Sequence, residues 1–136
     1  MAAKIPDRHP ASATVKVAWV SGILEVAWTG RVDGDAVTRA LDDARRLVGD
    51  RQLTRIVVDT EGVTGYELSV RAPSVSFLQF FKSRGLTEIV AVMPNPLVSM
   101  FAGTMRLVTK VRFAIYKTRP EAMRYLAERS ADAAAE

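Results

Sequence analysis

Short apolar runs alternate with longer amphipathic segments along this chain, and this alternation constrains the fold more than any other feature. The runs have the length and composition of strands, whereas the segments between them repeat apolar residues at steps of three and four, as helices do. The predicted order is β-β-α-β-α-β-α-β-α. Strands that alternate with helices form mostly parallel sheets with right-handed crossovers. The sequence therefore predicts an α/β fold with a mixed, mostly parallel sheet of about five strands and about four helices.

A predicted β-hairpin opens the sheet. Two alternating runs flank a two-residue turn at Ser21 and Gly22. Counting outward from this turn puts six large apolar side chains on one face, in three facing pairs: Trp19 with Leu24, Val17 with Val26, and Val15 with Trp28. The hydrophobic pattern and the turn thus agree on one register.

The later elements follow from the same patterns. We expect helices over residues 37–48 and 95–110, one that ends near 84–85 and one from 119 onward, and strands over 55–59, 89–92 and 111–116. Asp33 or Asp35 is expected to cap the first helix, and Gly49 to end it. Two glycines predict a loop over residues 60–65. The start of the second helix stays open, because Pro73 must lie in or before its first turn.

Composition excludes several kinds of chemistry. The 136 residues include no Cys and a single His, His9. Disulfides, thiolate catalysis and Cys-ligated zinc are therefore excluded, and a catalytic triad lacks its imidazole. Asp59 and Glu61 could form a catalytic carboxylate pair, but we favour Asp59 binding loop amides and Glu61 facing water. No phosphate-binding glycine motif is present. We expect no enzyme activity, no metal and no cofactor.

The charge is basic but scattered. The net charge is +4, and residues 69–136 hold ten Lys/Arg against five Asp/Glu. Without clustering, these charges predict a solvated surface and no nucleic-acid partner. No run reaches the ~20 apolar residues of a membrane-spanning helix, and no signal-peptide pattern is present. We expect a cytoplasmic protein with one domain over residues 14–128, between tails at 1–13 and 129–136.

The predicted helix at 95–110 is apolar around more than one face. Such a helix is either deeply buried or contacts a partner. Its candidate face for self-association, as a homodimer, or for ligand binding consists of Leu97, Met100, Phe101 and Met105. Plain core packing is the other interpretation, and both stay open at this stage.

Three local sequences and the element order resemble the STAS domain, the family of sulphate transporters and anti-sigma-factor antagonists, and in particular its lipid-binding-like (STAS/Sec14) bacterial branch. The local sequences are GILEV at 22–26, IVVDTEGV at 56–63, and VRFAIY at 111–116 with RPEAMRYL at 119–126. The resemblance covers residues 14–128. It implies a non-enzymatic bacterial regulator that docks a kinase-like or other signalling protein.

In the antagonists that this chain resembles, a serine ten positions after the strand-ending aspartate is phosphorylated within an Asp-Ser-Ser-Gly motif. Ten positions after Asp59 stands Ser69, with Glu67 at the motif's aspartate, whereas Leu68 and Val70 depart from the motif. The resemblance implies a phospho-acceptor at Ser69, and an ordinary capping or loop serine is the alternative. The implied partner-docking loop consists of Asp59, Glu61, Tyr66, Glu67, Ser69 and Arg71.

Two functions are compatible with these observations. The first is the regulatory protein-interaction module that the resemblance implies. The alternative is a domain that binds a small apolar ligand or lipid, and the apolar helices at 75–81 and 97–108 favour it. A ligand-sized apolar pocket would count against the first function and support the second.

Overall fold

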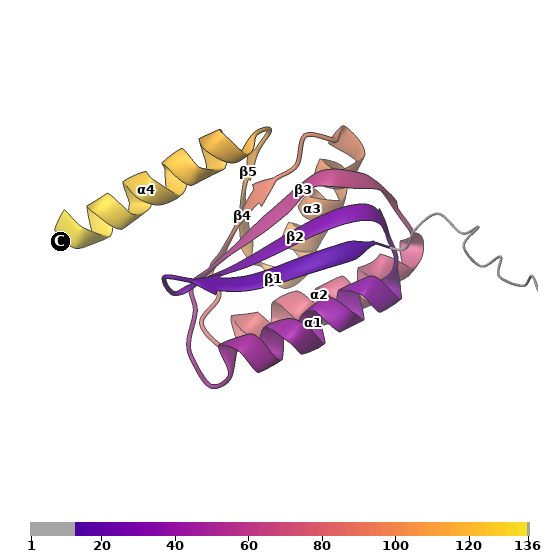
Figure 1. The fold of residues 1–136 in the computed structure, drawn as a ribbon, viewed down its shortest axis with the longest axis horizontal. Coiled ribbons are helices and arrows are strands. Elements are labelled where there is room, and N and C mark those ends of the chain that lie inside the picture. Colours follow the sequence, from indigo (N-terminus) through magenta and orange to yellow (C-terminus); the bar gives the residue numbers. More distant parts are fainter. Residues whose placement is uncertain (1–12, 136) are drawn as a thin grey trace, which may run out of the picture.

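A five-stranded sheet in the order β1-β2-β3-β4-β5 forms the centre of the protein (Figure 1), as seen in a computed structural model that describes residues 13–135. The strands are β1 (Thr14–Val20), β2 (Ile23–Val32), β3 (Arg55–Tyr66), β4 (Glu88–Val92) and β5 (Arg112–Tyr116). β1 and β2 are antiparallel, and every other neighbouring pair is parallel. The predicted mixed sheet is confirmed. His9 and the rest of the predicted N-terminal tail through residue 12 lie outside the described residues.

The helices cover the two faces of the sheet unequally (Figure 1). Helices α1 (Gly34–Val48), α2 (Arg71–Lys82) and α3 (Pro96–Thr109) pack on one face, and α4 (Arg119–Ala135) packs on the other. A short 3-10 helix, η2 (Leu68–Val70), precedes α2. α4 continues to Ala135, so the expected tail after residue 128 is helical over most of its length.

The hairpin has the predicted register. Trp19 lies opposite Leu24, Val17 opposite Val26, and Val15 opposite Trp28. Ser21 and Gly22 have φ angles of 52° and 81°. Two successive residues with positive φ form the turn whose twist matches that of paired strands.

Local capping determines where the helices begin and end. At α1 the cap is Asp33 and not Asp35, because the Asp33 carboxylate accepts a hydrogen bond from the amide of Ala36 at 2.9 Å. The helix ends at Gly49, as predicted, with a φ angle of 60°. At α3 the side chain of Asn95 accepts a bond from the amide of Leu97 at 2.9 Å.

The loop expected over residues 60–65 is wrong, because β3 continues through this segment to Tyr66. β2 and β3 stay paired there across two register shifts, with Thr29 opposite Gly62 and Gly30 opposite Val63. A Cβ atom added to Gly62 would lie 2.7 Å from the methyl group of Thr29. The glycine that suggested a loop is therefore needed for close approach of two strands at a bulge.

The core divides along β4, whose five residues are all buried. Ile89 and Ala91 belong to the larger cluster beneath α1, α2 and α3, whereas Val90 and Val92 pack with α4. β5 follows the same alternation but is an edge strand. Its Ile115 is 40% exposed, so this strand is only partly covered.

Candidate functional site

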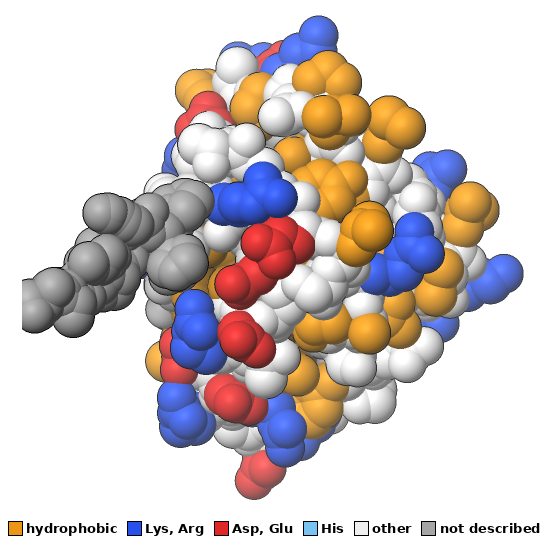
Figure 2. Space-filling model, turned by 90° about the vertical axis from the view of Figure 1, so that its right-hand side faces the viewer, with side chains coloured by type: hydrophobic (Ala, Val, Ile, Leu, Met, Phe, Trp, Pro, Cys, Tyr) orange, Lys and Arg blue, Asp and Glu red, His pale blue; other side chains and the backbone are white. Residues whose placement is uncertain are grey.

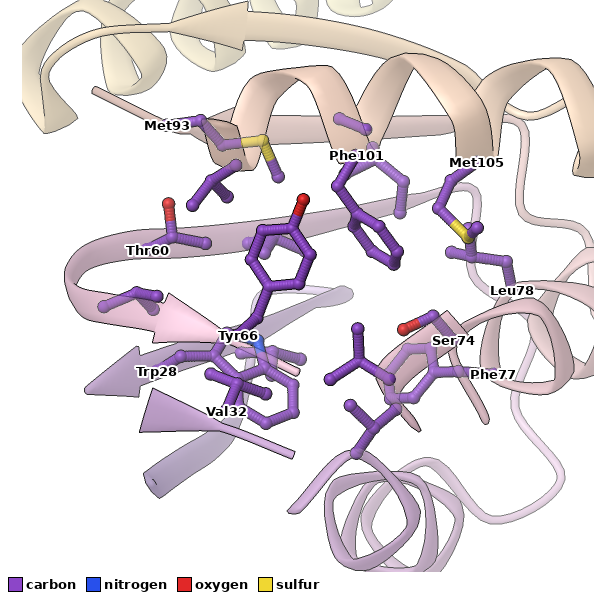
Figure 3. A pocket seen from close by; sticks show the side chains of 18 of the residues that line it. Trp28, Val32, Thr60, Tyr66, Ser74, Phe77, Leu78, Met93, Phe101 and Met105 are labelled. Atoms are coloured by element: carbon purple, nitrogen blue, oxygen red, sulfur yellow. The ribbon is translucent and has the colours of Figure 1, made fainter. Parts of the chain in front are cut away.

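An apolar pocket lies between the sheet and helices α2 and α3 (Figure 3). Its volume is about 120 Å³, and it is partly open to solvent. A cavity of roughly 150 Å³ with apolar walls is large enough to hold benzene. The pocket thus has about the size of one small ring. The lining residues are Val26, Trp28, Val32, Val37, Val58, Thr60, Val63, Tyr66, Val70, Ser74, Phe77, Leu78, Ile89, Met93, Val98, Phe101, Ala102, Met105 and Phe113.

Periodicity explains how these side chains converge. Alternation along the strands directs every second residue to the α2–α3 face, for example Val58 and Thr60 of β3. On α3, Val98, Ala102 and Met105 recur at steps of three and four and are at most 5% exposed. Because Ala102 ends at its Cβ atom, the middle of this helical stripe leaves space next to the sheet.

Three hydroxyl groups belong to this otherwise apolar lining. The Thr60 hydroxyl donates to the carbonyl of Val92 at 2.8 Å, and the Tyr66 hydroxyl donates to the carbonyl of Leu97 at 3.3 Å. Figure 3 shows the Ser74 hydroxyl directed into the pocket. Of the described residues that line the pocket, none is Asp, Glu, Lys or Arg. The site therefore suits an uncharged molecule with little polar surface.

Aromatic rings form much of the wall. The rings of Tyr66 and Phe101 lie 5.2 Å apart, centroid to centroid, and are inclined by 48°. Trp28, Phe77 and Phe113 also line the pocket. The hydrogen bond from Tyr66 to the first turn of α3 links the end of β3 to this helix across the pocket.

The predicted face on α3 is divided between two environments. Phe101 and Met105 line the pocket, and Met105 is only 2% exposed. Leu97 and Met100 are 64% and 68% exposed and point away from it, as do Leu107 and Val108. The sequence cannot separate these groups, because the whole helix is apolar and both sets recur at helical spacing.

The stretch of sequence that contains α3 carries charge of one sign. Residues 89–120 hold five Lys/Arg and no Asp/Glu. Figure 2 shows a face of the molecule on which hydrophobic side chains spread among Lys and Arg on one half, whereas the other half carries Asp and Glu together with further Lys and Arg. Self-association through Leu97 and Met100 stays a prediction.

The residues of the predicted docking loop have different environments, and docking through them stays a prediction. Asp59 accepts a hydrogen bond from the amide of Glu61 at 2.9 Å, and Glu61 is exposed, as favoured from the sequence. Tyr66 belongs to the pocket wall. Glu67 pairs with Arg31 at 3.4 Å, and Arg71 is exposed at the start of α2.

Ser69 lies in η2, before the first residue of α2. Its side chain is exposed, and its hydroxyl accepts a hydrogen bond from the amide of Gly34 at 3.0 Å. Gly34 is the first residue of α1, and a Cβ atom there would lie 2.6 Å from the carbonyl oxygen of Ser69. The serine thus contacts the N-terminus of α1, whereas α2 begins at Arg71 with Pro73 in its first turn. Phosphorylation of Ser69 stays a prediction.

A charged cluster that sequence reasoning missed surrounds Glu88, the first residue of β4. Its carboxylate contacts Arg55 at 2.9 Å, Arg112 at 3.2 Å and the hydroxyl of Tyr125 at 2.6 Å. Burial raises the pKa of Glu88, but the hydrogen bonds from Tyr125 and Arg55 and the charge of Arg112 outweigh it, so the pKa lies below its ordinary value. An acidic residue next to a buried apolar run was the available signal.

A second charged cluster ties α4 to the sheet. The guanidinium of Arg119 contacts Glu25 at 3.0 Å and Asp59 at 3.1 Å. The hydrogen bond to Glu25, more than the partial burial that opposes it, raises the pKa of Arg119. Both clusters join strands to α4 and lie outside the pocket lining, so we assign them to stability.

Within residues 13–135, no group of three His, Cys, Asp or Glu side chains is placed to hold a metal ion. No helix in that range has the length and apolar character that crossing a membrane requires.

Solved structures show what the architecture is similar to. An anti-sigma factor antagonist from Mycobacterium paratuberculosis has a TM-score of 0.58 and 16% identity, covering 83% of this chain and 92% of that one. The anti-sigma factor antagonist SpoIIAA in its unphosphorylated form has a TM-score of 0.60 and 15% identity, covering 84% of this chain and 98% of that one. A DUF3478-family protein with a SpoIIAA-like fold from Shewanella loihica has a TM-score of 0.56 and 11% identity, covering 85% of this chain and 94% of that one. No protein-family model and no curated protein sequence matches the chain.

The chain has a STAS-like fold. The resemblance predicted from the sequence is confirmed at this level, because the likeness covers more than four-fifths of the chain and nearly all of each similar structure. At identities of 11–16%, the likeness concerns the fold alone. The function of this STAS-like protein has to be argued from its own pocket and surfaces.

Proposed function

We propose that this STAS-like protein binds a small apolar molecule in the pocket between its sheet and helices α2 and α3, without catalysing a reaction. The observation that carries the proposal is the pocket itself, with a volume of about 120 Å³ and a lining that is apolar except for three hydroxyl-bearing residues. A preformed apolar pocket with few polar groups is the usual form of a small-molecule site. This function is the alternative that the sequence left open.

The volume limits what the pocket accepts. Drug-sized ligands occupy pockets of about 300–1,000 Å³. This pocket, at about 120 Å³, holds a fragment or one end of a longer molecule whose remainder leaves through the open side. An acyl chain would fit only in part, because most of its methylene groups would remain outside.

Benzene is a suitable probe, because it has the size of the pocket and carries no polar group. We expect saturable chemical-shift changes at the lining residues of ¹⁵N-labelled protein, and a rise in melting temperature with benzene concentration. The substitution Ala102→Leu, which adds three carbon atoms to the wall, should reduce the affinity at least tenfold. The control is Ala72→Leu, the same change at an exposed position of α2, which should leave it unchanged.

Absence of saturable benzene binding to the wild-type protein would refute the proposal. Equal binding to the Ala102→Leu variant would place the benzene site outside the pocket. Native mass spectrometry of freshly purified protein adds an independent measurement, since a retained natural ligand would appear as a mass above that of the chain.

A regulatory protein-interaction module is the second candidate. It is supported by the fold shared with anti-sigma factor antagonists and by an exposed segment in which Leu68 is 85% accessible beside the Ser69 hydroxyl. We propose for this case a cytoplasmic bacterial regulator that docks a kinase-like or other signalling protein. A phosphate on Ser69 would add negative charge near Glu67 and the α1 cap Asp33, and would thereby change this surface.

The second candidate is tested by a pull-down from native lysate with the wild-type protein, Ser69→Asp and Ser69→Ala. A partner that binds the wild type and the alanine variant, but is lost with the aspartate, would support the phosphorylation switch. Ser76→Asp, which places the same charge on an exposed position of α2, is the matched control. A partner that binds all four proteins equally would leave Ser69 without a regulatory role.

A further inference from the structure

The chemistry of the pocket wall narrows the class of ligand. Resting on the proposed function, we infer that the natural ligand presents to the pocket a neutral, single aromatic ring with one hydrogen-bonding group, and that the hydroxyl of Ser74 binds this group. Size, charge, wall composition and the placement of the hydroxyls support the assignment independently.

The absence of charge in the wall excludes ionic ligands. Among the described residues that line the pocket there is no acidic or basic side chain. An ion transferred into apolar surroundings loses its hydration without gaining a partner, and this cost exceeds what contacts with a few methyl groups return. A carboxylate or an ammonium group would therefore have to remain outside the open side.

The wall favours a flat ring over an aliphatic ligand. Five aromatic side chains line the pocket, and Figure 3 shows Tyr66, Phe77 and Phe101 around its central space. Tyr66 and Phe101 are already inclined to each other by 48° at a centroid distance of 5.2 Å. A third ring that packs against such a pair meets their edges and faces, which adds attraction beyond that of apolar contact. A saturated ring is thicker and lacks this electrostatic component.

Of the three hydroxyl groups in the lining, that of Ser74 is the one that the fold leaves for a ligand. The hydroxyls of Thr60 and Tyr66 already donate to backbone carbonyls. Within the described residues no hydrogen bond involves the Ser74 hydroxyl, although helical hydroxyls elsewhere, such as that of Thr109, donate to a carbonyl one turn earlier. Figure 3 shows the Ser74 oxygen directed into the pocket. It can donate to or accept from one polar group on a bound ring.

The test compares phenol, benzene, benzoate and cyclohexanol at pH 7 by chemical-shift titration of the full ¹⁵N-labelled chain. In an apolar cavity without a partner, a hydroxyl weakens binding because it loses its bonds to water. With Ser74 as the partner, we expect phenol to bind the wild type at least as tightly as benzene. Benzoate and cyclohexanol should each bind at least tenfold more weakly than phenol.

The substitution Ser74→Ala isolates the hydroxyl. We expect it to weaken phenol binding about fivefold, the value of one hydrogen bond to an uncharged group, and to change benzene binding less than twofold. Ser76→Ala, two positions further along α2 with an exposed side chain, is the matched control and should change neither affinity.

The outcomes separate this inference from the function on which it rests. If benzene binds but Ser74→Ala leaves the ratio of phenol to benzene affinity unchanged, the role of Ser74 is wrong and the pocket function survives. Equal binding of cyclohexanol would overturn the aromatic assignment, and equal binding of benzoate would overturn the neutral one. If benzene does not bind the wild type, the proposed function itself fails.

Discussion

The two faces of the sheet are packed in different ways. On the α4 face, Val57, Val90 and Val92 form a small core with Ala122 and Leu126, and charged clusters around Glu88 and Arg119 join strands to the helix. On the opposite face, three helices cover a larger core that still encloses a pocket of about 120 Å³. On the first face, close packing and paired charges hold α4 against the sheet. On the second face, the pocket and the available hydroxyl of Ser74 allow a ligand to bind. The difference separates residues that stabilise the fold from those that can hold a ligand.

The largest effect is expected at the Glu88 cluster. Glu88→Ala removes a buried carboxylate that accepts from Arg55 and Tyr125, and the half-buried Arg55 loses its partner. Removing one member of a buried ion pair costs about 3 kcal/mol of unfolding free energy, measured by urea denaturation. Glu61→Ala, at an exposed acidic residue on β3, should change the free energy of unfolding by less than about 0.5 kcal/mol. A loss below about 1 kcal/mol for Glu88→Ala would show that the α4 side does not depend on this cluster.

A matched pair of substitutions compares the two faces directly. Ala102 on α3 and Ala122 on α4 are both at most 1% exposed and face the sheet. Ala122→Leu should cost about 2 kcal/mol, because the added atoms meet a filled core. Ala102→Leu should stay within about 1 kcal/mol of the wild type, because the added atoms enter the pocket. Chemical denaturation measures both values.

Equal costs for the two substitutions would contradict the comparison. They would mean that the pocket walls resist filling as strongly as the α4 core does. If Ala102→Leu raised the free energy of unfolding and also abolished benzene binding, this would be the clearest support for a pocket that lowers stability but is needed for binding.

The smallest effect concerns pH. Because the pKa of Glu88 is lowered in the folded state, the unfolded state binds more protons around pH 4, and stability rises with pH there. The contribution of Glu88 is therefore complete above the ordinary glutamate pKa of about 4.3 and is lost as pH falls through the folded value. Urea midpoints between about pH 6 and 3 should fall further for the wild type than for Glu88→Gln. If the urea midpoints of the two proteins fell equally with pH, the contacts of Glu88 would contribute nothing to the pH dependence of stability.

Much of the fold follows from local patterns. Pairing in the hairpin, the end of α1 at Gly49 and the order of strands and helices along the chain were all predictable, because each depends on residues close together in sequence. The predicted loop at 60–65 failed for a long-range reason, since Gly62 serves the approach of Thr29 on a neighbouring strand. The site was predicted only in part. Phe101 and Met105 line the pocket, whereas Trp28 and Ser74 gave no signal that separated them from ordinary core and surface residues.

The sequence by itself determined the order of the strands and helices along the chain. It also determined that the chain has no Cys and a single His, residue types on which many catalytic sites depend. Only the tertiary structure decided that α3 has an inner side on a pocket and an outer side in solvent, and that Ser74 points into that pocket. The reason is physical. The periodicity of apolar residues along a chain shows which face of a helix or strand is buried. The volume of a pocket depends instead on how closely several helices and strands approach one another and on how much of the space between them their side chains fill. That difference exists only once the elements have packed.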